Sequence, residues 1–291
     1  MKYDVKICIS YDYDRPAVGG RHLVCLMPQD LDHTQQITSA TLHITPDPAE
    51  RLDRRDFFGN HLTEFSFRGP HDRVMLTLTA QLWRADAPHC LGPSASLTDL
   101  PRQLALCRDV GPQSPLHFLA ASTRVPRDAD MAAFARSYVG PDATVAETVL
   151  ALGNALHTHM TFDATATTVD TPAAEAFAKR RGVCQDFSHI MIACLRSLGI
   201  PAGYVSGLLR TLPPPGKPRL EGSDAMHAWV RAWCGETAGW LEFDPTNASP
   251  AGGDHIVVAY GRDYSDVAPV KGMMRTSGSQ KSQQAVDVIP L

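Results

Sequence analysis

The sequence predicts an α+β protein, in which an N-terminal β-sandwich precedes a core of helices packed on an antiparallel sheet. Two observations lead to this prediction. Short runs of strand character fill residues 1–85, whereas helical periodicity begins only after about residue 128 and gives way to further strand-like runs. The 291 residues suffice for two domains, which we expect at 1–85 and 128–291, with a connecting region at 86–127.

The N-terminal region contains five runs with strand character. The first, from Tyr3 to Tyr11, alternates apolar residues with mostly polar ones, as a strand with one buried face does. The others are HLVCLM (22–27), ATLHIT (40–45), HLTEFSF (61–67) and VMLTLTAQLW (74–83). Because turn-forming residues separate these runs at similar spacing, they favour a β-sandwich. No concentration of chemically reactive residues accompanies them.

The connecting region is rich in proline and has no clear period, and helices are expected after it. The residues TVAE at 144–147 have the spacing of a capping box and predict a helix that runs to about His159. The pair TP at 171–172 fits an N-cap followed by the first helical residue, which predicts a helix over 172–180.

The most informative helix begins at or near Cys184. Apolar residues recur along one face of it, at Phe187, Ile190, Met191, Cys194, Leu195 and Leu198. Gly199 ends the helix and Pro201 prevents its continuation. Strand-like pieces follow at 204–209, 228–233, 240–243 and 256–260, so the helical layer is expected to pack on an antiparallel sheet.

Cys184 stands apart from the other six cysteines of the chain. A cysteine without CxxC spacing is ordinarily a small buried apolar residue, and Cys194, in the middle of the apolar face, fits that role. At the start of a helix, however, unpaired N–H groups and the helix dipole stabilise a thiolate. The same N–H groups can stabilise the oxyanion of a tetrahedral intermediate. Cys184 is therefore the candidate nucleophile.

A base and a carboxylate are available on two consecutive predicted strands. His227 opens HAWVRAW and Asp244 closes WLEFD. If Gly235 and Glu236 form a two-residue turn, paired positions sum to 471, which places His227 opposite Asp244. A carboxylate beside an imidazole fixes its tautomer and stabilises the imidazolium, which in turn stabilises a thiolate. Singly, a histidine on a strand or an aspartate before a proline is more often structural.

The sequence resembles the bacterial transglutaminase-like family over nearly its whole length. The resemblance rests on GVCQDFSHIMIACLRSLGIPAGYVSGLL (182–209), HAWVRAW (227–233), GWLEFDPTN (239–247) and HIVVAYGRDYSDVAPVKG (255–272). The N-terminal stretch, including FFGN (57–60), resembles the domain that precedes this core. The resemblance implies a papain-like transglutaminase core, with Cys184 as nucleophile, His227 as base and Asp244 as the orienting carboxylate.

The family reaction implied by this resemblance is acyl transfer from a peptide, protein or amide substrate. The thiolate attacks an amide carbonyl, ammonia or an amine leaves, and an amine or water releases the thioester. Hydrolysis is slightly favoured over cross-linking, because water is always available and no acceptor site is evident. The alternative is a non-catalytic protein- or peptide-binding module on the same fold, which would not require all three residues.

Further residues near the candidate triad carry alternative interpretations. Gln185 and Asp186 follow the nucleophile and are candidates for substrate contact, although Asp186 also suits a first helical turn for its charge alone. Trp229 could line a substrate cleft, but an aromatic residue on a strand is more often part of the core. The proline-rich segment Leu212–Ser223 is equally consistent with a lip over the cleft and with a solvated loop.

Composition narrows the partners. A formal net charge of −4 and the absence of a Lys/Arg run argue against nucleic-acid binding. No apolar run approaches the roughly 20 residues of a membrane span, and the acidic N-terminal residues do not resemble a signal peptide, so we expect a cytoplasmic protein with no membrane partner. No cofactor is implied, and no clustered carboxylates suggest a calcium or other metal site.

Overall fold

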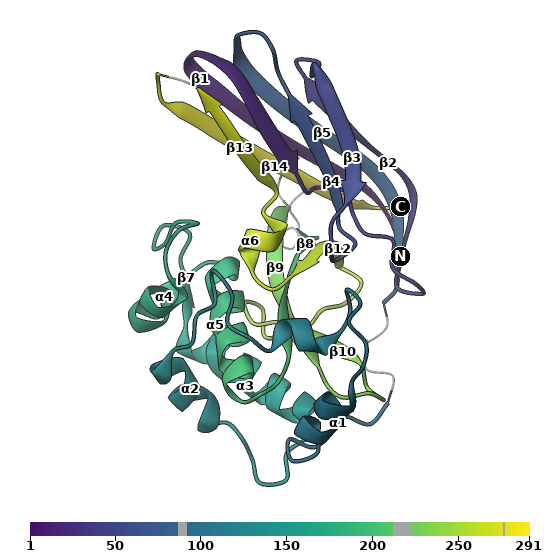
Figure 1. Cartoon of the computed structure of the whole chain (residues 1–291), viewed down its shortest axis with the longest axis vertical. Helices are drawn as coiled ribbons and strands as arrows, with labels where there is room; N and C mark the ends of the chain where they lie inside the picture. The colour runs from purple at the N-terminus through teal and green to yellow at the C-terminus, as the bar shows by residue number, and fades with distance from the viewer. Residues whose placement is uncertain (87–91, 212–221, 223, 276) are drawn as a thin grey trace, which may run out of the picture.

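The computed structural model describes residues 1–86, 92–211, 222, 224–275 and 277–291. A strand-rich part occupies one end of the molecule and a helix-rich part the other (Figure 1). The predicted α+β class is confirmed. Among the described residues, no helix has the length and apolar character needed to cross a membrane.

The strand-rich part is an antiparallel sheet of seven strands among the described residues. Its order is β2-β5-β1-β4-β3, and two C-terminal strands also pair with β1. The strands are β1 (Lys2–Val24), β2 (Gln35–Thr45), β3 (Glu50–Arg55), β4 (His61–Ser66), β5 (His71–Arg84), β13 (Val270–Arg275) and β14 (Gln280–Pro290). The first half of β1 pairs with β5 and β14, and its second half pairs with β4 and β13.

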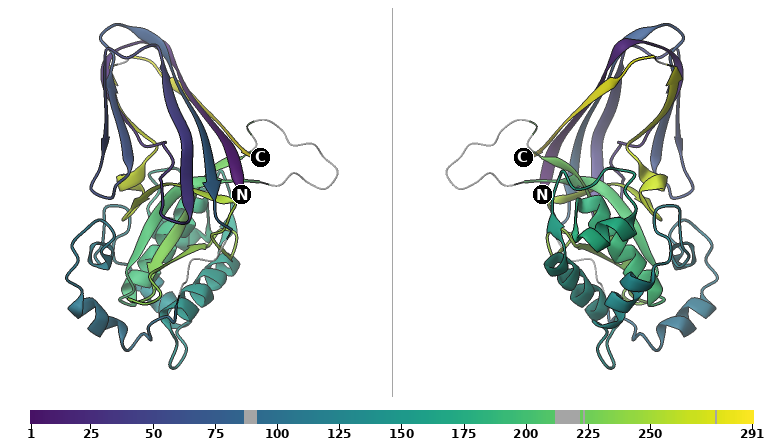
Figure 2. Two further views of the ribbon diagram at one scale, coloured as in Figure 1. Left: turned by 90° about the vertical axis from the view of Figure 1, so that its right-hand side faces the viewer. Right: turned by 90° about the vertical axis from the view of Figure 1, so that its left-hand side faces the viewer.

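This change of partners along β1 curls the sheet. Its register with β5 shifts between Asp12 and Ala17, where the strand turns from one half of the sheet to the other. Seen from the side, the halves form two layers (Figure 2). The apolar side chains enclosed between them include Val5, Ile7 and Phe65, so the expected sandwich is realised as one curled sheet.

The C-terminal segment lies in this curled sheet, although the sequence-based division placed all of 128–291 in the core. Strand β14 runs along β1 from Tyr3 to Tyr13, and β13 pairs with Val24 and the residues before it. Apolar alternation in β14 is restricted to its end, at Val286 and Val288. The pattern therefore indicates a strand at most and cannot identify a partner more than 250 residues away.

The helix-rich part is built on a five-stranded antiparallel sheet of order β11-β10-β9-β8-β12. The strands are β8 (Ala202–Leu209), β9 (Ala225–Trp233), β10 (Trp240–Asp244), β11 (Ser249–Pro250) and β12 (His255–Gly261); β6 (Thr161–Phe162) and β7 (Arg181–Gly182) form a separate parallel pair. The helices are α1 (Leu100–Leu106), the 3-10 helix η1 (Pro115–Phe118), α2 (Ala129–Arg136), α3 (Val145–His159), α4 (Ala173–Lys179), α5 (Cys184–Ser197) and α6 (Tyr264–Val267).

Helix α5 is the centre of this part. It packs on β8 and β9 with one side and is covered by α2, α3 and α4 on the others. Every side chain from Gln185 to Leu195 is buried, which explains why the helix is apolar beyond a single face. Its end agrees with the prediction, because Gly199 takes a positive φ of 76° directly after it.

The two earlier helices match the sequence to within a residue. Thr144 and Glu147 form the expected capping box of α3. Helix α4 begins at Ala173, and Pro172 rather than Thr171 is its N-cap. The hydroxyl of Thr171 accepts a hydrogen bond from the backbone N–H of Thr168 instead, so it stabilises the preceding loop.

Buried amide side chains join the two parts along the outer edge of β12. Gln35 of β2 accepts a hydrogen bond from the Val257 N–H (2.9 Å) and donates to the Val257 carbonyl (2.7 Å). Asn60, in the FFGN sequence, does the same for the N–H and carbonyl of Tyr260, both at 2.8 Å. Both amides are fully buried. They replace the neighbouring strand that the edge of β12 lacks.

Candidate active site

Cys184 is the first residue of α5 and is half-buried. Its position follows from Asp186, whose carboxylate accepts hydrogen bonds from the N–H of Val183 (2.8 Å) and the hydroxyl of Thr167 (2.7 Å). Asp186 thereby satisfies the backbone N–H just before the helix. The sulfur is therefore held at the N-terminal end of the α5 dipole, as the sequence predicted.

His227 and Asp244 are in direct contact, although the predicted register is wrong. Nε2 of His227 lies 2.7 Å from Oδ2 of Asp244. Strands β9 and β10 pair with positions that sum to 473, as in Trp233 with Trp240, because the turn between Cys234 and Gly239 has four residues, 235–238, rather than two. The shift by two residues keeps both side chains on the same face and makes them diagonal rather than direct neighbours.

Asp244 is fully buried and accepts hydrogen bonds from five donors. Oδ2 accepts from His227, from His255 Nε2 (3.1 Å) and from Asn247 Nδ2 (2.7 Å), whereas Oδ1 accepts from the backbone N–H groups of Thr246 and Asn247 (2.9 and 3.2 Å). Burial alone would raise the pKa of this carboxyl. The hydrogen bonds and the charge of His227 outweigh burial and place the pKa well below its usual range.

His227 connects the carboxylate to the cysteine. Because Nε2 faces Asp244, Nδ1 is the ring nitrogen left for Cys184, which lies near enough to raise the pKa of the imidazole. Burial lowers the pKa of His227, but the hydrogen bonds and charges of Asp244 and Cys184 raise it to about 10 overall. The structure thus brings together the three residues that the sequence singled out, in the order cysteine, imidazole and carboxylate.

The three candidate substrate contacts have internal partners. Nε2 of Gln185 donates to the Val169 carbonyl (3.1 Å), and Asp186 is 1% exposed and engaged at the start of α5. Trp229 is fully buried, donates from Nε1 to Glu242 (2.8 Å) and packs on Gly207, where a Cβ would lie 2.3 Å from the indole ring. Each of the three therefore has a structural partner, and substrate contact by them stays a prediction. The segment Leu212–Ser223 lies outside the described residues, apart from Gly222.

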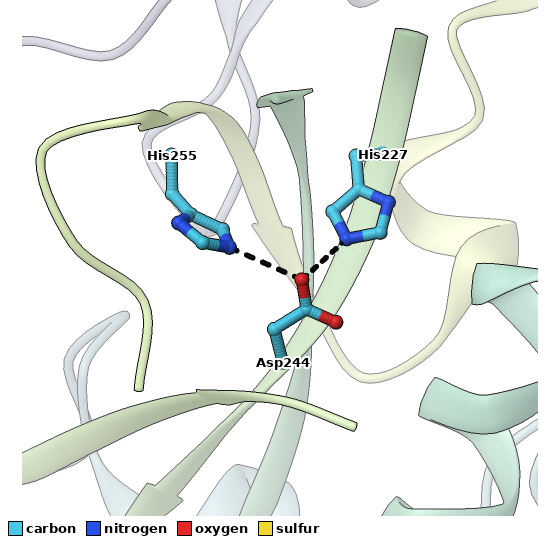
Figure 3. A group of neighbouring side chains, drawn as sticks. All are labelled: His227, Asp244 and His255. Carbon is cyan, nitrogen blue, oxygen red and sulfur yellow. Dashed lines mark hydrogen bonds and ion pairs between the residues drawn. The ribbon is translucent and has the colours of Figure 1, made fainter. Parts of the chain in front are cut away.

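His255 was not predicted as a site residue from the sequence. This residue opens β12, is 6% exposed and reaches the same oxygen of Asp244 as His227 does (Figure 3). Its one sequence signal was its place at the start of a predicted strand, which His227 shares. The contact depends on the sheet order, in which β12 and β10 lie on opposite sides of the β8–β9 pair. That order is not visible in the sequence.

His227, Asp244 and His255 also have the composition of a metal site, since their potential ligand atoms lie within 4.8 Å of one another. The hydrogen bonds argue against metal binding by His255. The N–H of Gly252 donates to Nδ1 of His255 (3.2 Å), so in the neutral ring the proton is on Nε2. A protonated Nε2 donates to Asp244 and has no lone pair for a metal.

Comparisons with known proteins agree with this architecture. Residues 132–245 match the model of the transglutaminase-like superfamily, and residues 3–82 match that of the bacterial transglutaminase-like N-terminal region. An uncharacterized protein of Mycobacterium tuberculosis is 35% identical over 263 residues, which cover 88% of this chain and 82% of the relative. One from Mycobacterium leprae is 30% identical over 289 residues, covering 97% and 96%. The chain belongs to the transglutaminase-like superfamily and carries the bacterial N-terminal region.

The fold has a counterpart among solved structures. A crystal structure of a candidate cysteine protease from Cytophaga hutchinsonii superposes with a TM-score of 0.76, covering 99% of this chain and 90% of that one. The sequence identity is 22%, so the likeness concerns the fold, including the papain-like core and the strand-rich N-terminal part.

Proposed function

We propose that the protein is a thiol-dependent enzyme that cleaves peptide or amide bonds through Cys184, His227 and Asp244. The observation that carries the proposal is the 2.7 Å hydrogen bond between His227 and the buried carboxylate of Asp244, with Cys184 near enough to the same imidazole to raise its pKa. Its position at the first residue of α5 adds support, because the helix N-terminus favours a thiolate.

The proposed reaction has two steps. The Cys184 thiolate attacks the carbonyl carbon of the substrate, and N–H groups at the start of α5 stabilise the tetrahedral oxyanion. The C–N bond then breaks, the imidazolium of His227 gives its Nδ1 proton to the leaving amine or ammonia, and a thioester remains on Cys184. In the second step, neutral His227 takes a proton from water or an amine as it attacks the thioester, which restores the thiolate–imidazolium pair.

Water is the acceptor that we favour. Cys184 is half-buried rather than enclosed, so water can reach the thioester. Hydrolysis and transfer to an amine use the same three residues and differ in the second step alone.

The primary test of this proposal is the rate at which iodoacetamide alkylates Cys184 between pH 5 and 9, with peptide mapping of the modified residue. In the wild type we expect selective reaction at Cys184 below pH 7, because the imidazolium stabilises the thiolate. In His227→Ala that low-pH reaction should fall at least tenfold. Cys194 is an internal control, since burial raises the pKa of its thiol to about 12.

A second assay distinguishes the acceptors. Ammonia release from glutamine-containing peptides and cleavage of denatured casein report hydrolysis, whereas incorporation of a dansylated amine into casein reports transfer, and Cys184→Ala is the control in each. A wild-type Cys184 that reacts only near pH 8.5, like a free thiol, would contradict the enzymatic proposal and favour a binding module.

A further inference from the structure

His255 contacts the candidate catalytic carboxylate but not the cysteine. Its Nε2 lies 3.1 Å from Oδ2 of Asp244, and its Nδ1 accepts a hydrogen bond from the Gly252 N–H at 3.2 Å. Figure 3 shows the rings of His255 and His227 approaching the same oxygen from two sides. Both ring nitrogens of His255 are thus engaged within the protein, which rules out a role as the base that deprotonates the nucleophile.

We propose that His255 is a positioning residue, a hydrogen-bond donor that orients Asp244 toward His227. The inference rests on the proposed function of Cys184, His227 and Asp244 and adds a fourth residue to it. The role follows from the three donors that converge on Oδ2, from His227, Asn247 and His255. Donors from three directions leave the carboxylate one orientation in which all are satisfied.

The backbone contact at Gly252 determines which ring nitrogen of His255 donates to Asp244. The Gly252 N–H donates to Nδ1, so the hydrogen bond to Asp244 comes from Nε2–H. His255 therefore contributes a donor with a fixed direction to Oδ2, beside the donor from His227.

The surroundings of His255 hold it in place. Its ring packs edge-on against Trp229 at a centroid distance of 5.1 Å, and the indole is fixed in turn by its hydrogen bond to Glu242. On the other side of β12, the N-terminal part secures the strand two residues further on, where Gln35 binds both backbone groups of Val257. His255 thus has little freedom to leave Asp244.

The test compares two substitutions at His255 by the same alkylation of Cys184, which requires no known substrate. His255→Gln can place an N–H donor near the position of Nε2, whereas His255→Phe fills the space without donating. At pH 6 we expect alkylation to fall about tenfold in His255→Phe, as for loss of a hydrogen bond to a charged group, and to stay within about threefold of wild type in His255→Gln. His22→Phe, a buried histidine of the curled sheet, is the matched control and should react as wild type does.

Melting temperatures of all variants separate a positioning role from lost packing. Equal alkylation rates in wild type and His255→Phe, or equal losses in the two His255 variants, would overturn the inference. If wild-type Cys184 itself reacts only near pH 8.5, the proposed function fails. That outcome differs from failure of the His255 inference, because it is seen in the wild type without any variant. A separate readout is the ¹⁵N spectrum of the histidines: we expect the neutral ring of His255 to carry its proton on Nε2, and a neutral ring with its proton on Nδ1 would contradict the inference.

Discussion

At the scale of single residues, Asp244 organises the candidate site. A fully buried carboxylate is costly to desolvate, and here five donors offset that cost. The donors hold it ionised, and its charge in turn favours the imidazolium form of His227, whose pKa is raised to about 10. In the proposed mechanism, the reactivity of Cys184 therefore depends on Asp244, which is hydrogen-bonded to His227 rather than to the cysteine.

The substitution Asp244→Asn tests this dependence. An amide removes the negative charge and directs an NH₂ group at donors, so the imidazolium loses its partner. Alkylation of Cys184 at pH 6 should fall by a factor of about 10² or more, given the roughly 10⁴-fold effect of the equivalent change in serine proteases. The free energy of unfolding should fall by about 3 kcal/mol, as for other broken buried pairs. Asp47→Asn, an exposed residue, controls for net charge.

The stability loss in Asp244→Asn should itself depend on pH. The pKa of Asp244 is lowered by folding, so its contribution is complete above the unfolded value of about 3.9 and is lost as pH falls further. Urea unfolding at pH 3, 4 and 7 should therefore give a difference between the two proteins that is largest at neutral pH and shrinks in acid. A difference that grows in acid would contradict the assigned direction.

The residues of the site were predictable from the sequence to different degrees. Cys184 was found because helix periodicity shows where a helix begins. The pairing of His227 with Asp244 was right despite a wrong register, because an error of two residues does not change the face of a strand. His255 was missed because its contact with Asp244 depends on sheet order. The burial of Gln185 and Trp229 was not predicted, because burial by distant segments cannot be seen in a sequence.

At the scale of elements, the start of α5 decides where the nucleophile lies. Asp186 fits against Gly182 so closely that a Cβ on Gly182 would lie 2.5 Å from the carboxylate and 2.8 Å from Cβ of Asp186. Asp186 is 1% exposed, so its side chain cannot move aside to make room for a methyl group. Glycine at 182 is thus required by this close approach, and β7 leads into α5 through it.

Gly182→Ala should therefore move the helix start and with it Cys184. Overpacking at this site should cost about 1–3 kcal/mol in the free energy of unfolding, measured by urea titration, and should slow alkylation of Cys184 at pH 6. The matched control is Gly140→Ala, where the added methyl group meets Ala143 at an ordinary 3.8 Å. Unchanged stability and alkylation in Gly182→Ala would show that α5 tolerates a different start.

Elements with strong periodicity were predicted well and those without it were not. The helices α3 and α5 have caps and apolar faces that appear in the sequence. The predicted run from Tyr3 to Tyr11 and the first half of the run at 22–27 proved to belong to one strand, β1, which continues through Pro16 and the positive-φ residues Gly19 and Gly20 and ends at Val24. Strand β3 was missed, since all six of its residues are exposed and none alternates.

At the scale of the whole molecule, the N-terminal part is continuous with the core in two ways. Its sheet takes up the C-terminal strands β13 and β14, so the chain leaves the core and returns to β1. Its buried amides at Gln35 and Asn60 complete the outer edge of β12. Because β12 carries His255, the N-terminal part supports the candidate site through a strand rather than through direct contact with the cysteine.

This arrangement predicts that the two parts unfold together. Gln35→Leu leaves the N–H and carbonyl of Val257 and the carbonyl of Gln29 without the amide that they bind. At about 1–3 kcal/mol for each such group, we expect the free energy of unfolding to fall by several kcal/mol. A urea titration followed by tryptophan fluorescence should show a single transition, and hydrogen exchange at the Val257 amide should become faster. Gln36→Leu, an exposed neighbour of the same type, should change neither. Two separate transitions in Gln35→Leu, with Cys184 alkylation at pH 6 unchanged in the surviving part, would instead show that the core functions without the N-terminal sheet.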